Sequence, residues 1–170
     1  MVLNFDLNLK QAKKEIKYSE QREFIIYENE EVRTYETSDE WLEKFAAAQH
    51  AIVDLLNKKY KLNIDLQNWV KGDTTDEVSS FLNEASSNCF ANAQYKCVWK
   101  MVLYLGDKGF ILGVFQKGKG FNAKEINTSK KKENVGKGFD FYRECKNVIF
   151  FDDPKDATTL FFSCSFEPLS

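Results

Sequence analysis

The chain has 170 residues, of which 43% are hydrophobic, 15% aromatic and 29% charged, and its formal net charge is -2 at pH 7. This composition is typical of a globular domain, so it disfavours disordered, collagen-like and membrane-embedded classes and gives no basic footprint for nucleic acid over the whole chain. From the length we expect a single domain that covers residues 1–170.

The N-terminal third of the sequence predicts strands with one short helix between them. Residues 3–9 alternate apolar side chains with Asn and Asp, which is typical of a half-buried strand. Residues 11–18 are rich in Lys and Glu and predict a short helix. Residues 23–27 and 32–36 predict the two strands of a hairpin around the polar residues 28–31.

Helices are predicted between about residues 38 and 88. Thr37 and Glu40 have the spacing of a capping box, and so do Thr74 and Glu77. A short helix is predicted between them, over residues 63–70. The first long helix has an apolar stripe at helical spacing, which should face the core: Trp41, Phe45, Ala48, Ile52, Leu55 and Leu56.

Strand patterns dominate the rest of the chain. Residues 95–105 and 110–116 predict a hairpin around Gly106-Asp107-Lys108-Gly109. Residues 139–142, 147–151 and 160–166 predict three more strands. We therefore expect an α+β fold in which helices (about 38–88) pack on a mainly antiparallel sheet, formed by the N-terminal strands and the strand-rich C-terminal half.

Neighbouring aromatic residues predict that this sheet is covered on both faces. The doublets Phe150-Phe151 and Phe161-Phe162 place one ring on each face of their strands. Helices on one side bury only one of these faces. The other face needs a second layer, which is a loop, a sheet or another protein.

Residues that would support metal or redox chemistry are sparse. The four cysteines are scattered, none forms a C-x-x-C pair, and His50 is the only histidine. We therefore expect no metal site, no cofactor and no catalytic residues. The N-terminus lacks the pattern of a signal peptide, and unpaired thiols suit a reducing compartment, so we expect a cytoplasmic protein without membrane contact.

Charge is unevenly divided along the chain. Residues 1–90 hold 11 basic and 17 acidic residues, whereas residues 91–170 hold 13 and 9. Acidic residues gather between positions 20 and 43, and a negative surface of this kind suits a basic protein partner. We expect a non-catalytic cytosolic protein-binding module, most concretely a small inhibitor of the immunity or antitoxin type whose partner is basic, for example a toxin nuclease. The expected partner-binding residues are Glu28, Glu30, Glu31, Glu36, Asp39 and Glu40.

Two alternatives remain open. The first is sequence-nonspecific nucleic-acid binding by a Lys-rich segment over residues 117–137, which contains no arginine for base readout. Its candidate phosphate-binding residues are Lys117, Lys119, Lys124, Lys130, Lys131, Lys132 and Lys137. The second alternative is a metal-dependent nuclease, in which Asp107 and Glu144 hold the metal ion and Lys146 orients water.

Overall fold

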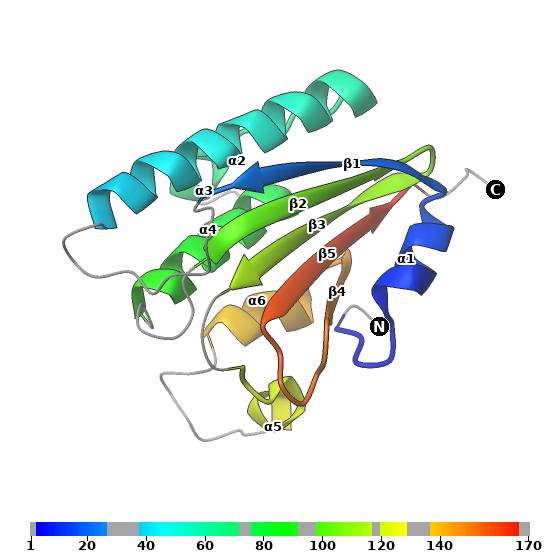
Figure 1. Ribbon diagram of the computed structural model, residues 1–170, viewed down its shortest axis with the longest axis vertical. Coiled ribbons are helices and arrows are strands. Elements are labelled where there is room, and N and C mark those ends of the chain that lie inside the picture. The colour runs from blue at the N-terminus through cyan, green and yellow to red at the C-terminus, as the bar shows by residue number, and fades with distance from the viewer. Residues whose placement is uncertain are drawn as a thin grey trace.

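One five-stranded antiparallel sheet organises the protein (Figure 1). The computed structural model describes residues 3–26, 38–71, 76–91, 98–116, 120–128 and 137–166. The strands are β1 (Tyr18–Ile25), β2 (Val98–Gly106), β3 (Gly109–Gln116), β4 (Val148–Phe151) and β5 (Thr159–Ser165), in the order β1-β2-β3-β5-β4. Every neighbouring pair is antiparallel, which confirms the predicted α+β class.

Helices lie on both sides of this sheet (Figure 1). Their bounds are α1 (Leu9–Glu15), α2 (Ser38–Tyr60), α3 (Gln67–Val70), α4 (Glu77–Ala91), α5 (Ala123–Thr128) and α6 (Lys137–Glu144). The predicted helical block is confirmed, and its last helix ends three residues beyond the expected limit, at Ala91. Within the described ranges, no helix combines the length and apolar character needed to cross a membrane.

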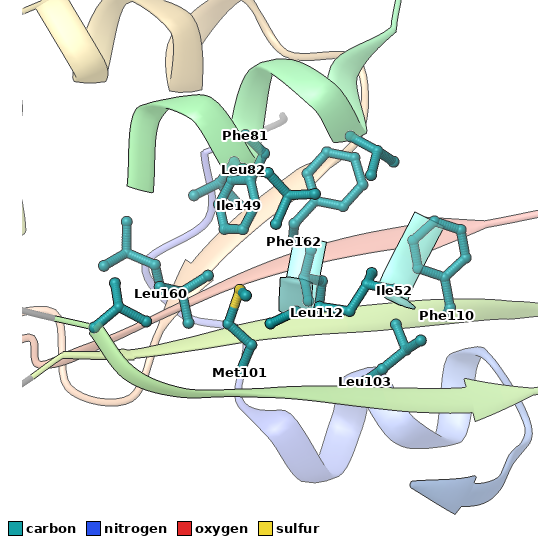
Figure 2. Packing of buried hydrophobic residues seen from close by; sticks show 14 of the residues in the cluster. Ile52, Phe81, Leu82, Met101, Leu103, Phe110, Leu112, Ile149, Leu160 and Phe162 are labelled. Atoms are coloured by element: carbon teal, nitrogen blue, oxygen red, sulfur yellow. The ribbon is translucent and has the colours of Figure 1, made fainter. Parts of the chain in front are cut away.

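The main core lies between the sheet and α2, α4 and α6. Figure 2 shows Ile52 of α2 and Phe81 of α4 pointing toward the sheet residues Leu112 and Phe162. The predicted stripe of α2 is buried except for the half-buried Leu55. Trp41 is 2% exposed, and its indole Nε1 donates a hydrogen bond of 2.8 Å to the Val98 carbonyl. Helical periodicity therefore identified the correct face of α2.

The opposite face of the sheet carries a second, smaller core. Ala12 of α1 and Ile16, the C-cap of this helix, are fully buried in a cluster with Tyr104, Phe150 and Phe161. Phe150 and Phe161 stack with ring centroids 4.8 Å apart. The prediction of a sheet covered on both faces is confirmed, but the second layer is the N-terminal helix of the same chain and not the expected loop, second sheet or other protein.

The β2–β3 turn connects these layers. Gly106 pairs with Gly109, so the loop contains only Asp107 and Lys108. Gly109 has φ +153, and a Cβ atom on Gly106 would collide with the Ile16 carbonyl oxygen, so both positions require glycine. The Lys108 N–H donates to that same Ile16 carbonyl at 2.9 Å. The turn is thus fixed to the end of α1.

The strand predicted over residues 3–9 is wrong. Leu3 forms an isolated bridge with Ile149, but the Asn4 side chain accepts hydrogen bonds from the Asp6 and Leu7 amides. The Asn8 side chain then accepts from the Gln11 amide and caps α1. Short polar side chains compete with a strand ladder for backbone donors, and here they turn the chain into a helix.

The strand predicted over residues 139–142 is also wrong, because this segment belongs to α6. Tyr142 of this helix is buried and its ring centroid lies 6.3 Å from that of Phe81 on α4. A short aromatic run has no periodicity that separates helix from strand, so tertiary packing decided its form. The predicted strand over residues 32–36 and its turn at 28–31 lie outside the described residues.

Two isoleucines provide a matched test of the main core. Ile52 is fully buried, whereas Ile25 at the end of β1 is 53% exposed. Ile52→Ala should lower the free energy of unfolding by about 3 kcal/mol, because it leaves a cavity between α2 and the sheet. Ile25→Ala should cost less than about 1 kcal/mol. Urea denaturation measures both values, and equal losses would contradict the assigned core.

Candidate functional site

A pocket of about 420 Å³ opens beside the start of α4. Its walls come from the loop after α2, the first turn of α4, the segment before β4, and the adjoining ends of β3 and β5. The apolar lining is Leu62, Ile64, Val78, Phe110, Cys164 and Phe166. The polar lining is Asn63, Asn68, Asp76, Glu77, Lys146 and Asn147. This is a mixed pocket in which two adjacent carboxylates meet an aromatic and aliphatic wall.

Glu77, the first residue of α4, joins this helix to the segment before β4. Its Oε2 accepts a hydrogen bond of 2.7 Å from the Lys146 N–H. Its Oε1 accepts from the Asn147 N–H at 3.0 Å, the Asn147 Nδ2 at 2.8 Å and the Cys145 Sγ at 3.0 Å. Thr74, the partner of Glu77 in the predicted capping box, lies outside the described residues, and the bonds described for the Glu77 carboxylate reach a segment distant in sequence.

Asp76 takes the capping role at the start of α4. Its Oδ1 accepts from the Ser79 N–H at 3.1 Å, as an N-cap side chain does. Its Oδ2 accepts from the Asp65 N–H and the Asn68 Nδ2, both at 3.0 Å. The Asp76 carboxylate thus holds the loop after α2 against α4 and shapes one wall of the pocket.

The environment of Glu77 favours its charged form. Burial is the largest single effect and raises the pKa, but the hydrogen bonds from Lys146, Cys145 and Asn147 together bring the pKa of Glu77 below its ordinary value. Burial also raises the pKa of the Cys164 thiol to about 11, and the Glu77 charge adds to this shift. The Cys145 pKa is raised by burial, by the hydrogen bond that its thiol donates to Glu77, and by the Glu77 charge. Neither thiol therefore has the low pKa of a reactive nucleophile.

Among the described residues, neither carboxylate has an ion-pair partner. All of their donors are neutral, and in the part of the chain that the structure describes, no Lys, Arg or His nitrogen lies within 4.0 Å of either group. Every carboxylate oxygen of Asp76 and Glu77 already accepts a bond from the protein. The two groups act as fixed negative charges, because their oxygens are committed to structural bonds.

The predicted acidic surface is described only at one end. Asp39 and Glu40 lie in the first turn of α2 with exposed side chains, and Glu40 forms an ion pair of 3.0 Å with Lys44. The other four predicted partner-binding residues, Glu28, Glu30, Glu31 and Glu36, lie outside the described residues. The pocket and this surface use different acidic residues.

The Lys-rich segment is described at two positions. Lys124 is exposed in α5, and Lys137 is the first residue of α6. The remaining candidates, Lys117, Lys119, Lys130, Lys131 and Lys132, lie outside the described residues. Nucleic-acid binding by this segment stays a prediction.

The nuclease candidates sit on separate elements. Asp107 lies in the β2–β3 turn, where its N–H donates to the Lys17 carbonyl. Glu144 is the exposed last residue of α6, and Lys146 binds Glu77 through its backbone. Among the residues with described positions, no three His, Cys, Asp or Glu side chains are grouped to hold a metal ion. The nuclease alternative therefore gains no geometric support from the described residues.

Sequence reasoning missed the pocket. Asp76-Glu77 stands directly before a helical pattern, which is a sign of a helix start and was interpreted only as such. The contact that defines the pocket joins Glu77 to Asn147, 70 residues away. Nothing in the local pattern around residue 147 indicates this pairing.

Comparison of the chain with protein-family models and with curated proteins gives no match.

Two glutamates of α4 test the electrostatics of this site. Glu77 accepts four hydrogen bonds and its pKa is lowered, whereas burial raises the pKa of Glu84. Glu77→Gln should lower the free energy of unfolding at pH 7 by about 1–2 kcal/mol, because an amide nitrogen replaces one acceptor. Glu84→Gln should leave stability unchanged or raise it. Urea denaturation of both variants at pH 7 makes this comparison.

The pH dependence of the two variants should have opposite signs. A lowered pKa means that Glu77 stabilises the fold above pH 4.5 and loses this effect as the pH falls through its folded-state value. The deficit of Glu77→Gln relative to wild type should thus shrink in acid. A raised pKa means that Glu84 destabilises the fold as the pH rises through 4.5. Over this rise, the free energy of unfolding of Glu84→Gln should therefore increase relative to that of wild type. A deficit of Glu77→Gln that grows in acid would contradict the assigned role of Glu77.

Proposed function

We propose that this protein is a non-catalytic protein-binding module of the cytoplasm, of the inhibitor, immunity or antitoxin type, and that it binds a basic partner such as a toxin nuclease. The partner-binding surface consists of Glu28, Glu30, Glu31, Glu36, Asp39 and Glu40. The observation that carries this proposal is the exposure of Asp39 and Glu40 at the start of α2. These two carboxylates directly continue the acidic segment that precedes the helix.

Neighbouring acidic residues support the same surface. Glu23 lies on β1, before the acidic segment, and Glu43 lies one turn into α2; both are exposed. The ion pairs of Glu23 with Lys100 and of Glu40 with Lys44 are at the surface, where such pairs are weak and exchange readily for a partner's cations. The positive end of the α2 dipole favours acids in its first turn, but it does not account for those further upstream.

A charge-reversal experiment tests this surface. The variant Glu36→Lys/Asp39→Lys/Glu40→Lys should bind a fluorescent oligolysine peptide about tenfold more weakly than wild type at low salt, measured by fluorescence anisotropy. The control variant Glu15→Lys/Asp54→Lys/Glu144→Lys makes the same change in net charge at exposed positions elsewhere. Equal losses in both variants would mean that the peptide senses only net charge, and this would overturn the proposed surface.

The inhibitor assignment has a separate test. Affinity capture from the native host should recover a basic enzyme whose activity falls when the wild-type protein is added. The triple charge-reversal variant should inhibit that enzyme at much higher concentrations, and added salt should weaken inhibition. A captured enzyme that keeps full activity in the complex would contradict the inhibitor assignment.

A further inference from the structure

The pocket beside α4 combines two features that together select a ligand. Its apolar side includes Val78, Leu62 and the half-buried Phe166. Its polar side includes the carboxylates of Asp76 and Glu77, which no cation neutralises within the described residues. A ligand that suits both sides has an apolar stem and a positive end.

The aromatic wall reinforces a preference for cations. Two rings line the pocket, Phe166 and Phe110, with centroids 6.2 Å apart; Tyr60, which is outside the lining, lies 5.0 Å from Phe166. The faces of such rings attract ammonium and guanidinium groups. The same chain already uses this contact elsewhere, since the Lys100 Nζ lies 4.6 Å from the centroid of Phe115.

We propose that this pocket binds the cationic side chain of an arginine or lysine, contributed by the basic partner. That the cation comes from a protein partner rests on the function proposed above, whereas the preference for a cation rests on the pocket. The volume of about 420 Å³ falls within the range of small-ligand sites and accommodates a long side chain. The methylene stem packs against the apolar wall while the charged end faces Asp76 and Glu77.

Charge argues against the other classes of ligand. An anion would face two fixed carboxylates, and among the described lining residues the exposed Lys146 is the only cation. A neutral apolar group would pack against the apolar lining, but it would place no positive charge near the two carboxylates. Glu77 already contributes to the raised pKa of the lining thiol Cys164, which is the effect of a negative potential at this end of the pocket.

Nuclear magnetic resonance with two matched probes tests whether the pocket prefers a cationic side chain to a neutral one of similar shape. N-acetyl-arginine amide should shift the backbone amide signals of Ser79, Lys146 and Asn147, whose N–H groups bind the two carboxylates. N-acetyl-citrulline amide has nearly the same shape without the charge, and it should bind at least about tenfold more weakly. Equal affinities for the two probes, or arginine shifts that avoid these amides, would overturn the proposal.

Charge variants at the rim provide the matched protein controls. Asn63 and Lys146 line the pocket with exposed side chains, and Lys155 is exposed in the β4–β5 turn, outside the pocket. Lys146→Glu should tighten arginine binding about fivefold and Asn63→Lys should weaken it about threefold, since each changes the charge near the ligand. Lys155→Glu should have no effect. An effect of Lys155→Glu equal to that of Lys146→Glu would overturn the site assignment.

The outcome separates this proposal from the function on which it rests. If the arginine probe leaves the pocket signals unchanged while the reversed acidic surface still loses oligolysine binding, the pocket proposal fails alone. The probe can also bind in the pocket while the captured partner keeps its affinity for the Asn63→Lys variant. In that case the pocket accepts a cation, and the claim that the partner supplies this cation is wrong.

Discussion

The fold depends on a sheet whose central strands are apolar on both faces. Seven of the eight residues of β3 are buried, and the two β5 neighbours Phe161 and Phe162 point to opposite sides of the sheet. Such strands are stable only when each face is covered. The protein meets this requirement with unequal layers, α2, α4 and α6 on one face and the short α1 on the other. The close contact of Gly106 with Ile16 joins the smaller layer to the sheet.

Helix α4 must be held in place for the larger layer to cover the sheet, and polar contacts at its first turn do this. Asp76 binds the loop after α2, while Glu77 binds the backbone of Lys146 and Asn147 before β4. These donors are neutral, and among the described residues no cation pairs with either carboxylate beside the apolar side chains. The same contacts that position the helix therefore create a negative, partly apolar pocket, which connects fold stability to the proposed binding of a cation.

The proposed partner-binding surface and the proposed cation pocket have complementary roles in the proposed complex. Exposed acids such as Asp39 on α2 provide long-range attraction, which chiefly raises the rate of association and depends on salt. A pocket that takes one cationic side chain provides a short-range, shape-dependent contact, the kind that dominates binding energy at protein interfaces. In this proposal the surface attracts a basic protein and the pocket fixes its orientation.

The sequence alone determined the fold class, the buried stripe of α2 and the β2–β3 hairpin, because each follows from local periodicity or from glycine at a tight turn. Residues 3–9 and α6 were misread, since Asn4 and Asn8 bind nearby amides and Tyr142 packs on α4, outcomes that alternation and aromatic content do not encode. Only the tertiary structure decided the pocket. Its defining bonds join Glu77 to Asn147 across 70 residues, and no local pattern specifies a contact of that length.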